Sequence, residues 1–94
     1  MDSGIGGATA AAVGDRLARV AEQVQVLLVT HSPQVAARGA AHLRVAKSAG
    51  VGRAETRVDP LAGGDRREEI ARMLAGESVT EAARAAADSL LGVA

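Results

Sequence analysis

The sequence predicts a small α/β domain, or a piece of a larger one, in the order loop–helix–strand–helix–strand–strand–helix–helix. Three observations support this prediction. Residues 24–30 (VQVLLVT) are almost wholly apolar, as in a strand buried on both faces of a parallel sheet. Residues 41–48 and 54–61 alternate apolar and polar side chains around a short glycine-containing connection, which favours an antiparallel pair at a sheet edge. Residues 67–91 repeat apolar side chains at helical spacing on both sides of Gly76.

The N-terminal part is expected to begin with a glycine-rich loop, DSGIGG (2–7), followed from about Ala8 by a helix. Four apolar residues share one face of that helix: Val13, Leu17, Val20 and Ala21. A helix that leads into a parallel strand normally belongs to a βαβ unit, so another strand should precede the loop. We expect that first strand to lie upstream of Met1 and therefore to be missing from this sequence.

End signals place the short helix that follows the apolar run. Ser32 is a suitable N-cap, Pro33 suits the first helical position, and Gly39 can close the helix.

The same kind of signal places the last two helices. Asp65 with Glu68, and Ser78 with Glu81, have the spacing of capping boxes. The first of these helices has an apolar face that ends at Gly76, formed by Ile70, Met73 and Leu74. The inner side of the last helix is expected to contain Val79, Ala83, Ala86 and Leu90.

The composition limits the classes of function. The 94 residues include no Phe, Tyr, Trp or Cys, so the core must come from aliphatic side chains and would be marginal without a neighbour. Eleven acidic and eleven basic side chains give zero net charge, which argues mildly against nucleic-acid binding through the chain's own surface. The lack of cysteine excludes disulfides and thiol–metal sites. No apolar run approaches the length of a membrane span, so neither export nor a membrane is expected.

His31 directly follows the apolar run, where the predicted strand ends. Ligands bind at the carboxyl ends of strands in open α/β sheets, and Thr30 and Ser32 add hydroxyl groups beside the ring. Taken alone, a structural or loop histidine is the more frequent outcome, so the residues leave both interpretations open. His42 has no cysteine or third histidine at ligand spacing, so no zinc site is predicted.

Two other motifs are ambiguous. The loop at residues 4–7 matches neither a Walker A loop nor a dinucleotide fingerprint, and could simply be a flexible lead into the helix. The helix pair at residues 67–91 resembles a helix-turn-helix in outline, but its second helix offers Arg84 and otherwise mostly Ala, Glu and Asp. Packing on the sheet or on a partner is the plainer interpretation.

Three segments nevertheless occur in a familiar order: residues 2–17, 26–48 and 66–91. They resemble the C-terminal part of the RecN family of bacterial DNA repair proteins, in the SMC-like branch of ABC ATPases. The stretches VTHSPQVA (29–36) and EIARMLAGESVT (69–80) make the resemblance specific. It covers essentially the whole chain, and implies that residues 1–94 are the C-terminal lobe of an ABC-type (P-loop) ATPase head.

The resemblance also implies what the chain lacks. The family has a Walker B strand ending in DEID before the glycine loop, and Asp2 matches the last residue of that motif. The Asp–Glu pair that binds Mg²⁺ should then lie just before Met1, and the Walker A loop, coiled coil and signature motif are also absent. We therefore expect a fragment that alone is neither an ATPase nor a tight ATP binder.

By the same resemblance, Asp2, Ser3 and Gly4 correspond to the D-loop, which crosses the dimer interface beside ATP. His31 corresponds to the switch histidine at the γ-phosphate, and Thr30 and Gln34 would support its loop. A hydrogen-bond donor there stabilises the charge that develops during phosphoryl transfer.

The implied partners are a second ATPase head in a homodimer and DNA bound by the full-length protein. The implied process is recombinational repair of double-strand breaks in the cytoplasm, at the nucleoid. Two alternatives stay open: an interaction module that supplies His31 to an ATPase head in trans, and a small DNA-binding protein using the last two helices.

Overall fold

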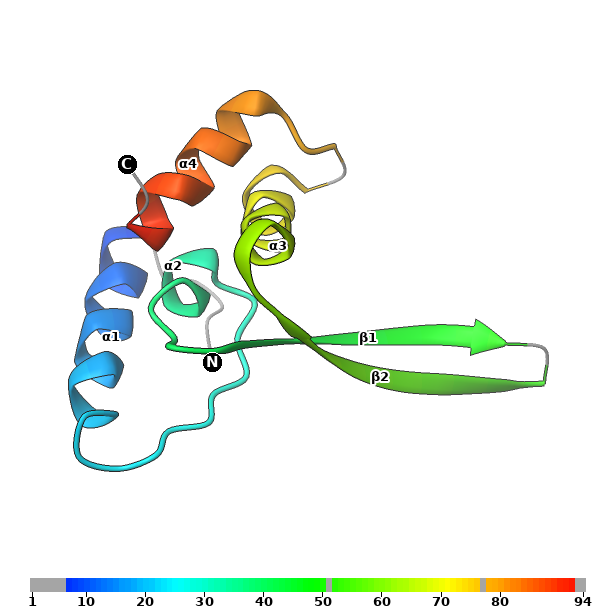
Figure 1. Cartoon of the computed structure of the whole chain (residues 1–94), viewed down its shortest axis with the longest axis horizontal. Helices are drawn as coiled ribbons and strands as arrows, with labels where there is room; N and C mark the ends of the chain where they lie inside the picture. Colours follow the sequence, from blue (N-terminus) through cyan, green and yellow to red (C-terminus); the bar gives the residue numbers. More distant parts are fainter. Residues whose placement is uncertain (1–6, 51, 77, 93–94) are drawn as a thin grey trace.

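The computed structural model describes residues 7–50, 52–76 and 78–92, and its fold is mixed α/β. Its elements, in chain order, are α1 (Gly7–Val20), α2 (Pro33–Ala36), β1 (His42–Gly50), β2 (Arg53–Leu61), α3 (Gly63–Ala75) and α4 (Glu81–Leu91). Figure 1 shows the four helices grouped at one side of the molecule, with the β1–β2 hairpin extending away from them. No helix in the described ranges is both long enough and apolar enough to cross a membrane.

The predicted strand at residues 24–30 is wrong for this structure. The segment has no regular secondary structure, and Leu27 and Val29 are 85% and 84% exposed. A strand persists when a neighbouring strand satisfies its backbone groups, and within the described ranges the sheet consists of β1 and β2 alone. The expected parallel sheet is therefore not observed, and the element order lacks that strand.

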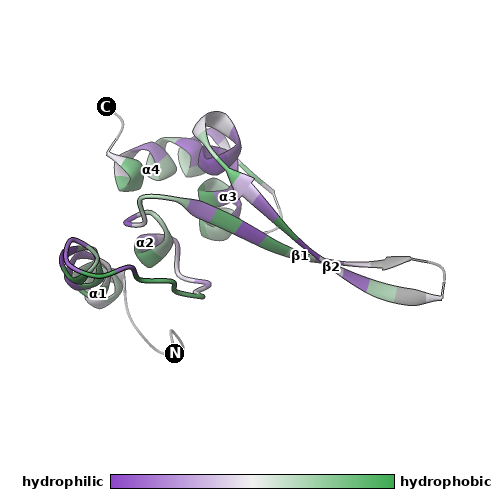
Figure 2. Ribbon diagram, turned by 60° about the horizontal axis from the view of Figure 1, so that its bottom comes forward, coloured by the Kyte–Doolittle hydropathy of each residue, from purple (hydrophilic) through white to green (hydrophobic). Residues whose placement is uncertain are grey.

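The predicted antiparallel hairpin is confirmed. β1 and β2 pair along their whole length, from His42 opposite Leu61 to Gly50 opposite Arg53. Gly52 has a φ of 90° in the connection, a backbone region that favours glycine. The face with Leu43, Val45 and Val58 leaves these side chains 51%, 59% and 55% exposed. In Figure 2 the base of the hairpin alternates hydrophobic and hydrophilic bands, and most of the extended segment before α2 is coloured hydrophobic.

The core lies between α3, α4 and the end of α2. Its buried residues are Ala37, Ile70, Ala71, Ala83 and Ala87, with Met73, Leu74, Val79, Leu90 and Leu91 packed around them. The predicted inner face of α3 is confirmed. The inner face of α4 passes through Ala87, whereas Ala86, which was expected inside, is exposed.

Both predicted capping boxes are wrong. α3 begins two residues before Asp65, after an N-cap at Ala62 that makes no side-chain hydrogen bond. α4 is capped by Thr80 instead of Ser78, and the Thr80 Oγ1 accepts a hydrogen bond from the Ala83 N–H at 3.1 Å. A capping side chain must lie next to the first free N–H groups, and the tertiary packing of the helices decides which residue that is. The predicted end of α3 at Gly76, where φ is 83°, is confirmed.

The buried face of α1 also differs from the predicted one. Ala10 and Gly14 are buried, whereas Val20 is 44% exposed. A Cβ atom on Gly14 would lie 2.9 Å from Arg38 Cγ and 3.3 Å from the Gln34 carbonyl oxygen. Small residues thus allow α1 to approach α2 closely, and apolar periodicity alone does not reveal that contact.

Candidate functional site

The candidate site is the His31 loop (residues 30–32), which joins the extended apolar segment to α2. Ser32 is the N-cap, as predicted, and its Oγ accepts a hydrogen bond from the Val35 N–H at 3.4 Å. The same hydroxyl donates to Gln34 Oε1 at 3.1 Å, and the Ser32 N–H donates to Thr30 Oγ1 at 3.0 Å. Thr30 and Gln34 therefore surround the Ser32 cap, next to His31.

His31 is an exposed residue at the border of a large apolar groove. The groove has a volume of about 1270 Å³ and is lined by parts of α1, residues 25–31, α2, β1 and α3. Its walls include the exposed side chains of Leu27, Val29 and Leu43. The lining also contains His42 and the charged residues Arg44 and Glu69, so His31 shares a mainly apolar groove with other polar groups.

The short helix α2 is held on several sides. Val35 and Ala37 are 5% and 9% exposed, and Ala37 belongs to the core with α3 and α4. The C-cap of the helix is Ala37, so the helix ends two residues before Gly39, where the sequence predicted its end. From α3, Arg66 Nη2 donates to the Ala36, Ala37 and Gly39 carbonyl oxygens at 3.2, 3.4 and 2.7 Å.

Sequence reasoning missed Arg66. An arginine in the first turn of an amphipathic helix is usually solvated, and no local pattern indicates carbonyl groups that lie about thirty residues earlier in the chain. Only the fold brings the end of α2 to the start of α3.

The three predicted D-loop residues Asp2, Ser3 and Gly4 lie outside the described residues. The structure therefore does not test whether they meet His31.

A second polar cluster surrounds the base of β1. Burial lowers the pKa of His42 below its ordinary value of 6.5, the charge of Arg66 lowers it further, and Glu69 acts in the opposite direction. The hydrogen bond from Arg72 lowers the pKa of Glu69. Among the described residues, no group of three or more His, Asp or Glu side chains is arranged to hold a metal ion. This cluster is therefore a set of ion pairs and hydrogen bonds at the hairpin base.

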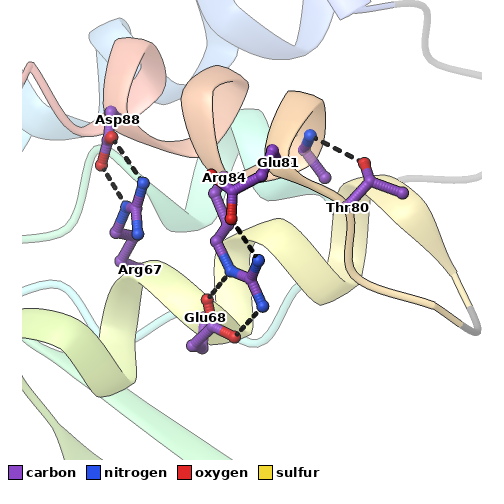
Figure 3. Close-up of polar contacts among 7 residues, drawn as sticks. Arg67, Glu68, Thr80, Glu81, Arg84 and Asp88 are labelled. Carbon is purple, nitrogen blue, oxygen red and sulfur yellow. Dashed lines mark hydrogen bonds and ion pairs between the residues drawn. The ribbon is translucent and has the colours of Figure 1, made fainter.

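Ion pairs join α3 to α4 (Figure 3). Arg67 makes two hydrogen bonds to the Asp88 carboxylate, at 2.7 and 3.0 Å. Arg84 binds Glu68 at 2.8 Å and Glu81 at 2.6 Å, and its hydrogen bond lowers the pKa of Glu68. Arg84, the basic side chain on which DNA binding by α4 would depend, is thus already paired with two carboxylates.

Comparison with known proteins identifies similar sequences. No family model matches the chain. The DNA repair protein RecN of Xylella fastidiosa (strain 9a5c) is 50% identical over 91 residues, which are 97% of this chain and 16% of that protein. The RecN proteins of Deinococcus radiodurans and Mycobacterium leprae are 47% identical over 92 residues and 50% identical over 94 residues. The resemblance predicted from the motifs is thereby confirmed, and the chain spans 16% of the length of these three relatives.

Proposed function

We propose that this chain, which matches the C-terminal part of RecN proteins, serves as one lobe of an ATPase head that acts in DNA repair. In this proposal His31 contacts the γ-phosphate of ATP, and Asp2, Ser3 and Gly4 form the D-loop at the interface with a second head. The principal support is the placement of His31, between an apolar segment and a helix that is capped and anchored. The process would be recombinational repair of double-strand breaks in the cytoplasm, with DNA bound by the longer protein.

The chemistry of His31 suits this role. An imidazole N–H can donate a hydrogen bond to a phosphate oxygen, and such a donor helps most when negative charge develops on the transferring group. Hydrogen bonds hold the backbone on both sides of Ser32, and this backbone carries the His31 ring into the proposed site. In this proposal the Mg²⁺ ligands belong to other segments of the longer protein; among the described residues, no three or more His, Asp or Glu side chains are grouped so as to hold a metal ion.

The uncovered groove supports a site that other segments complete. Residues 24–30 are almost wholly apolar, so both sides of the segment are apolar, and Leu27 and Val29 are more than four-fifths exposed. Burying such side chains contributes about 25 cal/mol per Å², so a folded head would cover them. We infer that strands from elsewhere in the longer protein pair with this segment and complete a sheet whose carboxyl end presents His31.

A chimera tests the proposal. The matching C-terminal segment of a RecN protein is replaced by residues 1–94, and ATP hydrolysis is measured. We expect His31→Ala to lower kcat by about a hundredfold, the scale of losing one transition-state hydrogen-bond donor. His42→Gln serves as the control, because His42 lies at the base of the hairpin. Hydrolysis by the chimera at an unchanged rate after His31→Ala would contradict the proposal.

The same proteins distinguish the proposed lobe from the alternative in which the chain acts in trans as a separate module. Residues 1–94 are mixed with a RecN protein that lacks the matching segment. Restored hydrolysis in the mixture would favour action in trans, whereas hydrolysis only in the covalent chimera would favour the lobe.

A further inference from the structure

Arg66 makes a contact that the proposed function does not yet use. It lies in the first turn of α3, and its Nη2 donates to the carbonyl oxygens of Ala36, Ala37 and Gly39. The last carbonyl groups of a helix lack partners within the helix and form the negative end of its dipole. The Ala36 oxygen also accepts from the Gly39 N–H at 3.2 Å, and the Arg66 guanidinium adds a charged donor to this end of α2.

The carbonyl groups that Arg66 contacts lie only a few residues after the His31 loop. α2 has four residues, so the Arg66 anchor at one end is a single helical turn from the Ser32 cap at the other. A helix of one turn is not stable by its own hydrogen bonds, and its position depends on what holds it. Here the N-terminal end is held by local side chains, and the C-terminal end by a residue from a different part of the fold.

We propose that Arg66 is a positioning residue for the nucleotide site: it holds the C-terminal end of α2 against α3 and thereby fixes the direction in which His31 enters the site. The inference rests on the proposed function, in which His31 meets the γ-phosphate. Arg66 Nη2 binds the Ala36, Ala37 and Gly39 carbonyl oxygens, so in this proposal Arg66 acts through α2.

The next residue provides a matched control. Arg67 is the same residue type in the same helical turn and is half-buried like Arg66. Its guanidinium binds Asp88 of α4 and makes no hydrogen bond to α2 among the described residues. Arg67→Ala therefore removes a side chain of the same size from α3, together with its ion pair to Asp88, and leaves the contacts of α2 in place.

The first experiment measures ATP hydrolysis by the chimera described above. We expect Arg66→Ala to lower kcat about tenfold and to change the KM for ATP less than about twofold, because a misplaced γ-phosphate donor is felt mainly in the transition state. Arg66→Lys should lower kcat less than Arg66→Ala does, since lysine keeps the positive charge although it lacks the planar set of donors. Free guanidinium ion should restore activity to Arg66→Ala and not to His31→Ala. A loss that Arg67→Ala shares, or that guanidinium does not reverse, would overturn the proposal.

The second experiment tests the contact between Arg66 and α2 in the absence of ATP. Hydrogen exchange is measured at the amides of Ala37, Arg38 and Gly39, which donate to α2 carbonyl oxygens. Arg66→Ala should speed their exchange about tenfold while the α3 amides stay protected. Unchanged exchange at these amides would overturn the anchoring role. If His31→Ala leaves hydrolysis unchanged, the proposed function fails, and the exchange result still decides the Arg66 contact by itself.

Discussion

Replacing Ile70 by alanine should be the most damaging single core substitution. Ile70 is fully buried and is the largest side chain in the described residues with no exposed surface. Isoleucine-to-alanine changes in cores cost about 2–5 kcal/mol, and the cost rises when the surroundings cannot collapse into the space. The other buried members of this core are alanines, whose methyl groups move only with the backbone, and the larger side chains packed around them are only partly buried. We therefore expect a loss of about 3–4 kcal/mol in the free energy of unfolding.

The predicted loss is a large share of the total free energy of unfolding. Domains of this length have free energies of unfolding of about 5–14 kcal/mol, and a core without aromatic side chains favours the lower end. Urea unfolding is followed by far-UV circular dichroism, because the chain has no Trp, Tyr or Phe for fluorescence. If the wild-type chain is near the lower limit, Ile70→Ala should retain only about 1–2 kcal/mol, so that about 3–16% of the molecules are unfolded before urea is added.

Two controls make this prediction refutable. Ile70→Val should cost about 0.5–1.5 kcal/mol, because it removes a single methylene group. Leu27→Ala removes a large apolar side chain that is 85% exposed, and should change stability by less than about 0.5 kcal/mol. A loss below about 1 kcal/mol for Ile70→Ala, or an equal loss for Leu27→Ala, would refute the placement of the core between α3 and α4.

Three further predictions concern packing, capping and pH. Gly14→Ala should destabilise the chain by about 1 kcal/mol in urea unfolding, because overpacking against α2 exceeds the gain in helix propensity; a stabilised variant would contradict the close approach. Thr80→Ala should cost about 1 kcal/mol in the same assay and Ser78→Ala almost nothing, since Thr80 caps α4; the reverse order would place the cap at Ser78. His42 has a folded-state pKa below its ordinary 6.5, so the unfolded chain binds its proton more readily and stability should fall as the pH drops below about 6.5. His42→Gln should flatten that fall between pH 7 and 5.5, and an unchanged slope would exclude His42 as its source.

Local signals in the sequence were sufficient for the hairpin and for much of the helical structure. Alternating side chains around a glycine turn predict two paired strands, and their register depends on residues close in the chain. The apolar face of α3 and its end at Gly76 likewise follow from spacing and from glycine's access to positive φ. The motif around His31 and the stretch at residues 69–80 were specific enough to predict the RecN resemblance.

Contacts between distant segments were decided by the tertiary structure. Residues 24–30 have the composition of a buried strand, but a strand exists only with a neighbour, and the sequence of one strand does not contain its partner. Gly14 packs against α2, and Arg66 anchors it, because the fold brings these residues to one place; neither belongs to a periodic pattern or a local motif. The sequence by itself thus determined the resemblance to RecN proteins, the hairpin and the end of α3, while the structure decided which distant residues pack against α2, the helix that follows His31.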